Sequence, residues 1–386
     1  MIHQFNAPQT IIHGTGASKE LLNQVKRLGS KRVLFVTDTF IESTGLIQKL
    51  AQPLLDESIS IAVFSAVQPD PTVQNVQAGL KLLHAHNADA IVAVGGGSPI
   101  DAAKAMSILT SNPEPLSQYM GYHKISKAGL PLIALPTTAG TGSEATKVTV
   151  ITDTEKDVKM MILDSHLMPT ISLVDYELSV SMPPSLTAYV GVDTLTHGIE
   201  AYVSKKANAM TDPIALSCIG LVAEHLHTAW SKPNDAQARS GMAIAACQGG
   251  MAFTNSSVCL VHGMSRPLGL QFHLAHGLSN AILLPAVTRF SVAGATEKYA
   301  TVARTMALAK KSQSDETACD NLVKGLIKLN KTLKVPRLRD CKGVNKTVFE
   351  KVLEKMACDA MASGSPQNNP IVPTVDQIIE IYKQAW

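Results

Sequence analysis

Short apolar runs and amphipathic stretches alternate along the first 180 residues. The apolar runs are bounded by turn-forming residues, as buried parallel strands are, and the amphipathic stretches have the period of a helix. The predicted strands lie within residues 2–14 (two extended pieces), 32–38, 60–64, 88–98 and 130–144, and the predicted helices are 18–28, 45–55, 73–86 and 100–109. Strands that alternate with helices predict βαβ units and a parallel sheet.

The pattern changes at Pro183 and Pro184, beyond which almost nothing has the alternation of a strand. The predicted helices there are 186–204, 213–229, 235–253, 278–290, 295–309, 314–329, 346–360 and 375–384. We therefore predict an α/β domain over residues 1–182 and an all-α domain over residues 183–386. Neither half contains an internal repeat or a low-complexity segment.

The composition describes a soluble globular protein, with 45% apolar and 17% charged residues and a net charge of +3 over 386 residues. The basic residues are dispersed, which argues against a nucleic-acid partner. No apolar run is long enough to cross a membrane, and the first residues lack the pattern of a signal peptide. Six scattered cysteines without a CxxC pair fit a reducing compartment. We expect a cytoplasmic protein with no membrane partner.

One acid and three histidines in the second half have a spacing that a metal ion can use. Asp193 and His197 are four residues apart in a predicted helix, so both side chains project from one face. His262 and His276 follow. A D-x-x-x-H pair alone is more often structural, but one carboxylate with three imidazoles suits iron or zinc better than magnesium or calcium. Such a set also leaves room for a substrate oxygen if the coordination number expands.

The stretch between the last two histidines contains Pro267 and Gly269. Both residues disfavour a continuous helix, so we expect the chain to break its helical pattern there and turn back.

A glycine-rich turn follows the predicted strand in ADAIVAVGGGSPIDAAK, residues 88–104. Glycines at a strand-to-helix turn allow backbone N–H groups to bind a pyrophosphate at the positive end of the helix. The turn lacks the third glycine and the later acid of the usual dinucleotide fingerprint. Asp38 instead ends an earlier strand, and in a doubly wound sheet both features can face the same ligand. A carboxylate there would bind an adenosine ribose and repel a 2′-phosphate.

A third polar segment, PTTAGTGSE (residues 136–144), also follows a predicted strand. Its four hydroxyl groups and two glycines could form hydrogen bonds around a cofactor, although alone it would be interpreted as a polar loop.

Together these segments resemble the iron-containing (group III) alcohol dehydrogenases, which include lactaldehyde reductase and 1,3-propanediol dehydrogenase. The resemblance runs from the N-terminus to the last helix. It rests on GGGSPIDAAK, LPTTAGTGSE, GVDTLTHGIEAY, HGMSRPLG and HGLSNAILLP, in that order. It implies the dehydroquinate synthase-like fold, with an N-terminal dinucleotide-binding α/β domain, an all-helical metal-binding catalytic domain and an active site in the cleft between them.

The resemblance also implies roles for individual residues. Fe²⁺, with Zn²⁺ as the alternative, would be held by Asp193, His197, His262 and His276. NAD would be held by Asp38 at the ribose and by Gly96, Gly97, Ser98, Asp101, Thr137, Thr138, Thr141, Ser143 and Lys159 elsewhere. Members of the family commonly form homodimers through their N-terminal strands.

Two positions depart from the family pattern. Relatives such as lactaldehyde reductase have a second histidine four residues after the third ligand, where this chain has Arg266, and a proline before the last ligand, where it has Ala275. His273 could replace the missing histidine, or it is a surface residue of the loop. Arg266 cannot relay a proton near neutral pH, but it could clamp a substrate carboxylate, or it pairs with a neighbouring acid or the cofactor phosphates.

We therefore predict a metal-dependent alcohol dehydrogenase or aldehyde reductase that transfers hydride between NAD(H) and a small primary alcohol, diol or hydroxy acid. One alternative is an NAD- and metal-dependent lyase of the dehydroquinate synthase type, whose metal site takes fewer histidines. A zinc hydrolase would need no glycine-rich loops, and a non-catalytic binding protein would explain neither site.

Overall fold

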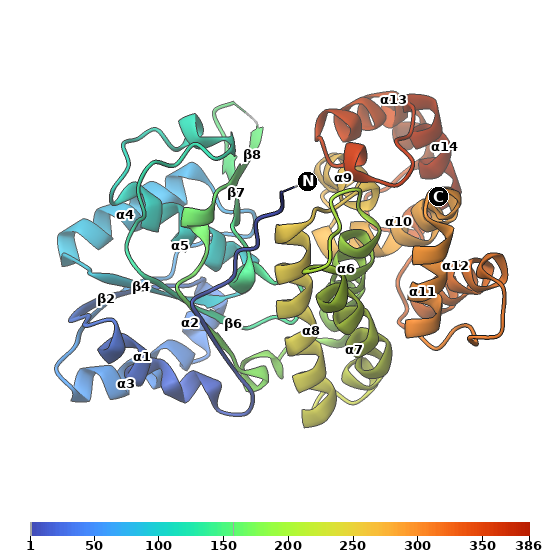
Figure 1. Ribbon diagram of the computed structural model, residues 1–386. Coiled ribbons are helices and arrows are strands. Elements are labelled where there is room, and N and C mark those ends of the chain that lie inside the picture. The colour runs from blue at the N-terminus through green and yellow to red at the C-terminus, as the bar shows by residue number, and fades with distance from the viewer. Residues whose placement is uncertain (1, 157) are drawn as a thin grey trace. The chain divides into compact units, whose positions relative to one another are not determined.

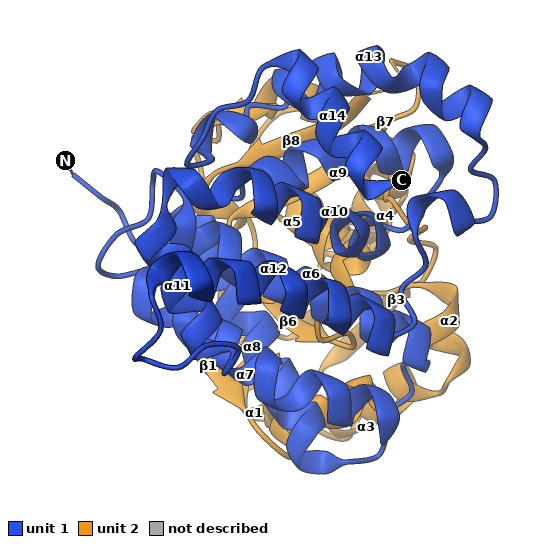
Figure 2. Cartoon of the chain, turned by 90° about the vertical axis from the view of Figure 1, so that its right-hand side faces the viewer, with its two compact units in different colours: residues 1–5, 181–386 blue, residues 6–180 orange. Residues whose placement is uncertain are grey.

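The structure is a computed structural model that describes residues 2–156 and 158–386. The chain forms two compact units, an α/β unit of residues 6–180 and a helical unit of residues 1–5 and 181–386 (Figure 2). The boundary between the units lies two residues before the predicted domain boundary, and the first five residues group with the helical unit.

The α/β unit is built on a parallel sheet of six strands (Figure 1). In spatial order these are β1 (Thr10–His13), β9 (Ile171–Val174), β6 (Leu132–Pro136), β4 (Ala90–Gly95), β2 (Arg32–Val36) and β3 (Ser60–Phe64). The predicted parallel sheet is therefore confirmed. Of the two extended pieces expected within residues 2–14, only the second forms a strand among the described residues.

Alternate residues of the sheet pack against helices on its two faces. Leu34 and Val36 belong to the core beneath α4 (Val73–His86) and α5 (Gly97–Leu109). Val33 and Phe35 belong to the core on the other face. The helices of that face are α1 (Leu21–Arg27), α2 (Thr39–Ser43) and α3 (Leu46–Asp56). Because both faces are covered, the central strands are apolar throughout rather than alternating.

A small second sheet was not predicted. Its strands are β5 (Gly121–Tyr122), β8 (Val158–Leu163) and β7 (Val148–Asp153), with β7 antiparallel to β8. The second sheet is attached to α5 through Asp101, whose carbonyl accepts from the Thr149 hydroxyl and whose carboxylate accepts from the Val150 backbone.

The helical unit contains the helices predicted after residue 183 and one more, Leu260–Phe272, that was not predicted. They are α6 (Pro184–Val203), α7 (Asp212–Ser231), α8 (Ala236–Asn255), α9 (Leu260–Phe272), α10 (His276–Ser291), α11 (Thr296–Thr305), α12 (Asp315–Thr332), α13 (Lys346–Ala362) and α14 (Val375–Ala385). From Gly191 onward every residue of α6 is buried. Glycine at Gly198 lets α7 approach closely, because a Cβ there would lie 2.9 Å from Ile219.

The predicted break at Pro267 and Gly269 is wrong. α9 continues through Pro267 and ends at His273, whose backbone has the left-handed φ of 52°. Proline costs the helix one hydrogen bond, but Pro267 and Leu268 are buried, so tertiary packing outweighs that cost. The Gly269 carbonyl accepts from the backbone of His273, and the chain turns at this cap, after both Pro267 and Gly269.

Among the described residues, no single helix has the length and apolar composition of a membrane span. The pair α8 and α9, bent by 105°, meets both criteria only when its two helices are taken together.

Candidate metal centre and cofactor-binding turn

α6 supplies the first two predicted metal ligands. Asp193 and His197 lie one helical turn apart and are 2% and 4% exposed. The His197 Nε2 atom lies 3.7 Å from Asp193 Oδ1. The burial of this carboxylate among apolar helices would be costly without compensation by a cation or hydrogen bonds.

The turn at the end of α9 brings two further histidines to Asp193. His262 lies near the start of α9, and His276 is the first residue of α10. Their Nε2 atoms lie 3.6 Å and 3.9 Å from Asp193 Oδ1. These three residues offer ligand atoms that all lie within 4.8 Å of one another. His197 contacts Asp193 and stacks on His262, with ring centroids 4.9 Å apart, but is not part of this compact group.

The geometry of the three-residue group fits a divalent transition metal. Ligand atoms of a tetrahedral site with bonds of about 2.1 Å are roughly 3.4 Å apart, close to the distances from Asp193. Burial, repulsion between the histidines and the charge of Arg266 lower the pKa of His262 well below its usual value. The same causes lower the pKa of His276 to about 4, although 49% of its side chain is exposed. Both rings are thus neutral and can offer a lone pair to a metal.

Glu200 is a member of the site that the sequence-based prediction missed. It lies seven residues after Asp193 on α6 and is 3% exposed. Its Oε2 accepts from His262 Nδ1 at 2.6 Å and from the Cys259 backbone at 2.8 Å, and its Oε1 accepts from the Val261 backbone at 2.6 Å. Burial raises the pKa of Glu200 to about 7, against these donors. A proton fixed on Nδ1 leaves Nε2 of His262 free to ligate.

Asn280 is the second missed residue. It lies four residues after His276 on α10 and is fully buried. Its Nδ2 donates to Asp193 Oδ1 at 2.6 Å and lies 3.2 Å from His262 Nε2 and 3.1 Å from His276 Nε2. Its Oδ1 is buried and has no hydrogen-bond partner in the described part of the chain. The amide therefore sits among the ligand atoms and holds the carboxylate in place.

Arg266 and His273, the two residues considered in place of the missing histidine, lie within α9 and at its C-terminal cap. Arg266 is half-buried one helical turn after His262, and its Nη1 donates to Ser365 Oγ at 3.1 Å. Its charge contributes, after burial and the other histidines, to lowering the pKa of His262 and His276. His273 is exposed and forms the left-handed cap of α9.

In the α/β unit the glycine-rich turn and the threonine loop come together. The parallel strands β4 and β6 are neighbours, so the segments that follow them emerge at the same edge. Gly96 precedes α5 as its N-cap, and a Cβ on it would touch Thr138 at 3.4 Å. A Cβ on Gly97 would lie 3.1 Å from Thr141. Glycine therefore allows the two segments to meet, as the predicted phosphate-binding turn requires. Ser98 is half-exposed in the first turn of α5.

Asp38 follows β2, the neighbour of β4, so it lies at the same edge of the sheet. Its Oδ1 accepts from the Ile41 backbone at 2.8 Å and caps α2. Oδ1 is thus used to cap α2, and Oδ2 is the atom that we expect to bind the ribose.

Other predicted cofactor residues form bonds within the unit. Ser143 Oγ donates to Asp101 Oδ1 at 2.7 Å, and burial raises the pKa of Asp101. Thr137 is buried, and its backbone donates to the Gly95 carbonyl at 2.9 Å. Lys159 lies on β8 in the second sheet, where it forms a 2.9 Å ion pair with Asp70. These bonds connect the residues to other parts of the same unit.

Lys104 is the centre of the buried network behind the turn. Its Nζ donates to Ser143 Oγ, Thr146 Oγ1 and the Val148 carbonyl at 2.8–3.0 Å. Burial lowers the pKa of Lys104 to about 8, while Asp101 and Glu144 oppose the shift.

Lys104→Met should lower the free energy of unfolding of the α/β unit by about 3 kcal/mol or more, because it leaves buried acceptors and carboxylates without their donor. Denaturant titration measures the loss, with Lys81→Met, an exposed lysine of α4, as the matched control. A variant as stable as the control would show that the network is dispensable.

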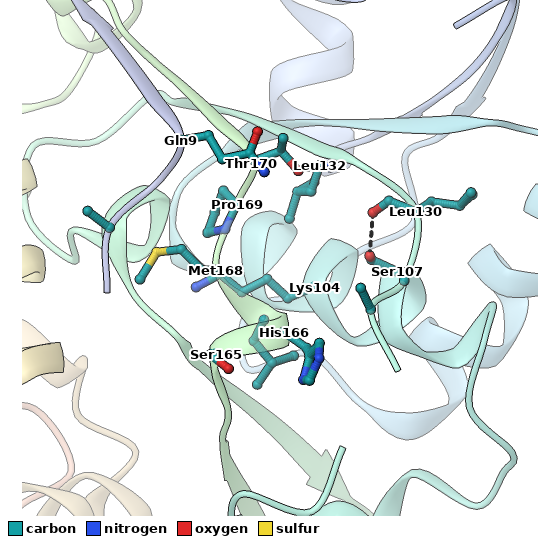
Figure 3. A pocket seen from close by; sticks show the side chains of 14 residues that line it. Gln9, Lys104, Ser107, Leu130, Leu132, Ser165, His166, Met168, Pro169 and Thr170 are labelled. Carbon is teal, nitrogen blue, oxygen red and sulfur yellow. Dashed lines mark hydrogen bonds between the residues drawn. The ribbon is translucent and has the colours of Figure 1, made fainter. Parts of the chain in front are cut away.

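A cavity of about 250 Å³ lies in the same unit, and Lys104 is one of its lining residues (Figure 3). Leu132 and Thr170, at the amino ends of β6 and β9, also line it. The glycine-rich turn follows the carboxyl end of β4, so this cavity is not part of the predicted cofactor site.

Comparisons with known proteins connect both sites to one family. Residues 8–176 match the model of the iron-containing alcohol dehydrogenases, and residues 187–386 match the C-terminal model of the same family. The chain is 37% identical to the NAD-dependent methanol dehydrogenase of Bacillus methanolicus over all of both chains. It is 37% identical to the lactaldehyde reductase of Escherichia coli K12 over 98% of each. The crystal structure of a 1,3-propanediol oxidoreductase superposes with a TM-score of 0.97 at 34% identity and full coverage of both chains.

Proposed function

The chain belongs to the iron-containing alcohol dehydrogenase family, and from this premise we propose that it transfers hydride between NAD(H) and a small primary alcohol, diol or hydroxy acid. The observation that carries the proposal is the compact group of Asp193, His262 and His276. The matching models and relatives are dehydrogenases and reductases, which favours this function over a lyase or a hydrolase.

Iron would be held by Asp193, His262 and His276, with His197 as the fourth ligand. His197 is supported by its place beside Asp193, one turn along α6. Bound iron supplies Lewis-acid polarisation of the substrate oxygen, and bound NAD(H) accepts or supplies the hydride.

The protein's own residues prepare the site for this chemistry. Glu200 holds the His262 ring by its Nδ1 proton, and Asn280 holds the Asp193 carboxylate. The neutral histidines add no charge to a site that has to accept a cation. Because these partners are buried and already oriented, the free-energy cost of reorganising the site when substrate binds is small.

NAD would be bound by the turn of Gly96 and Gly97, where backbone N–H groups and the start of α5 can receive the diphosphate. Thr138 and Thr141 border the turn and offer hydroxyl groups to the cofactor. Ser98, Thr137, Asp101, Ser143 and Lys159 remain proposed members of the wider cofactor site. The bonds of Asp101 and Ser143 to each other favour a role in shaping it.

Anaerobic purification followed by metal analysis, with alcohol oxidation and aldehyde reduction assayed under NAD(H), tests the proposed function. We expect iron to restore activity best after chelation, and full activity in metal-free protein would refute it.

Asp38 should exclude NADP(H). A carboxylate about 4 Å from a 2′-phosphate is repelled by roughly 1–4 kcal/mol, depending on solvation. Asp38→Gly and Asp38→Asn should therefore raise the NADPH/NADH ratio of kcat/KM by about tenfold or more. Asparagine can still cap α2 through its side-chain oxygen, so it separates the charge from the cap. An unchanged ratio in both variants would mean that Asp38 does not face the ribose.

We further propose that the protein is a cytoplasmic homodimer. All six cysteines are free and five are buried, as in proteins of reducing compartments. β1 lies at an edge of the parallel sheet, where the strand of a second copy could approach. Light scattering on the purified protein tests the dimer.

A further inference from the structure

A second pocket lies entirely within the helical unit, and no proposed metal ligand lines it. It has a volume of about 620 Å³, and its walls come from α10, α12, the segment 334–340 and the end of the chain at residues 384–386. His276 is the first residue of α10, whereas Arg289, which lines the pocket, is in its last turn. A helix of 16 residues is roughly 24 Å long. The pocket is therefore distinct from the metal centre, and its volume is that of a small-molecule site.

The floor of the pocket is apolar and partly open to solvent. Ile282, Pro285 and Ala286 lie on one face of α10, at positions i, i+3 and i+4. Ile327 of α12 lines the same pocket and is 47% exposed. Adjacent apolar side chains on a concave surface are typical of ligand-binding grooves.

Contacts between the surrounding elements hold the pocket in shape. Asn330 Nδ2 on α12 donates to the Ala281 carbonyl of α10 at 2.6 Å. The Trp386 ring stacks on Phe349, with ring centroids 4.4 Å apart. Because the walls are already fixed by these contacts, a ligand would lose little affinity to the ordering of the pocket.

Cations line the pocket in excess; we call it the basic pocket, after Arg289, Lys331, Lys334 and Arg337. Asp340 is the one acidic side chain among its lining residues, and it is paired with Arg337 at 2.8 Å. The carboxylate of Trp386, the last residue of the sequence, still leaves the cations in the majority.

Two of these cations have no protein partner. Arg289 and Lys331 are exposed, and within the part of the chain that the structure describes their side chains form no hydrogen bond or ion pair. Both lie in the last turn of a helix, where a cation offsets the helix dipole. The dipole does not explain why both line one pocket with an apolar floor, whereas an anionic ligand with an apolar body does.

We propose that the basic pocket binds a small amphipathic phosphate, a monoester whose aliphatic chain covers the apolar floor and whose phosphate contacts Arg289 and Lys331. A phosphate monoester carries nearly two negative charges near neutral pH, which matches the excess of cations. Guanidinium and ammonium groups both bind phosphate. Aliphatic floor residues suit an alkyl chain better than a heterocyclic base, whose polar edges need hydrogen-bond partners. Such binding goes beyond the proposed hydride transfer and does not depend on it.

Tryptophan fluorescence reports on the basic pocket directly. The chain has two tryptophans, and Trp386 lines the pocket, so the emission of Trp230→Phe comes from Trp386 alone. We expect decyl phosphate, kept below its critical micelle concentration, to change this emission saturably. Inorganic phosphate, which lacks the chain, and decyldimethylphosphine oxide, which has the same chain and an uncharged head, should each bind about tenfold more weakly or worse. Titration calorimetry repeats the comparison on the wild-type protein.

Variants separate the two halves of the ligand. Arg289→Gln/Lys331→Gln should weaken binding of decyl phosphate on the order of 10- to 100-fold, the value of charge-assisted hydrogen bonds, and leave that of the phosphine oxide unchanged. Lys324→Gln/Lys328→Gln is the matched control, because it removes the same charge from exposed positions of α12 that do not line the pocket. Ile327→Gln should weaken binding of decyl phosphate but not of inorganic phosphate. The melting temperature of each variant excludes a loss caused by unfolding.

Several outcomes would overturn the proposal. They are the absence of saturable binding, equal affinity for decyl phosphate and either of its two controls, and equal effects of the two double variants. Binding to vesicles that contain phosphatidic acid, without binding of monomeric decyl phosphate, would replace the pocket ligand with a membrane surface. Because no readout depends on turnover, a protein that binds decyl phosphate but reduces no aldehyde would refute the dehydrogenase and support the basic pocket.

Discussion

Replacing His262 with alanine should abolish iron binding and turnover together. The imidazole supplies one of three ligand atoms that lie within 4.8 Å of one another. Without it, only Asp193 and His276 of this group, which lie on two other helices, would remain to bind the ion. Lewis-acid catalysis contributes several kcal/mol, so its loss corresponds to roughly a thousandfold or more in rate.

The fold should survive this change better than the activity does. NADH binding should persist, because the predicted cofactor turn is in the α/β unit and His262 is in the helical unit. Iron content, circular dichroism and NADH titration on the same preparation distinguish these effects. His227→Ala is the matched control, since His227 is an exposed histidine of α7. A variant that keeps iron and turns over normally would remove His262 from the site.

Much of the α/β fold could be predicted because local pattern and final burial agree there. Strands such as Arg32–Val36 are apolar because both faces of the sheet are covered, and α4 begins and ends at the predicted residues. The sheet of β7 and β8 escaped prediction for a related reason. Burial alternates along β7, but its buried positions are Thr149, Ile151 and Asp153, so no apolar pattern marks the buried face. β7 is also attached through Asp101, a contact between residues almost 50 positions apart.

The candidate site was also predicted only in part. Asp193 and His262 could be proposed from their chemistry and spacing, whereas the turn between the last two ligands was placed wrongly, since tertiary packing overrode a local breaker at Pro267. Glu200 and Asn280 were not predicted, because their bonds join residues 62 and 87 positions apart. A weak signal existed for each: Glu200 follows Asp193 by seven residues on one helix face, and Asn280 follows His276 by four.

Glu200→Gln should weaken iron binding about 10- to 100-fold, as the loss of a hydrogen-bonding partner behind a metal-binding histidine typically does. Three N–H donors converge on the two carboxylate oxygens of Glu200. A glutamine has one acceptor oxygen and one amide donor, so in either orientation of the amide at least one of the three donors faces an N–H group.

The orientation that the glutamine adopts decides which property is lost. If its amide nitrogen faces Val261, a buried backbone donor stays unpaired, and the free energy of unfolding falls by about 1–3 kcal/mol. If the nitrogen faces His262, it favours the tautomer that carries its proton on Nε2, which cannot ligate iron. Iron affinity by competition with a chelator and stability by denaturant titration separate the two outcomes. Glu224→Gln, an exposed glutamate of α7, is the matched control. The prediction would be contradicted if iron affinity stayed within about threefold of wild type and the free energy of unfolding stayed within about 0.5 kcal/mol, roughly the range of neutral surface changes. In that case His262 would need no carboxylate to hold its ring.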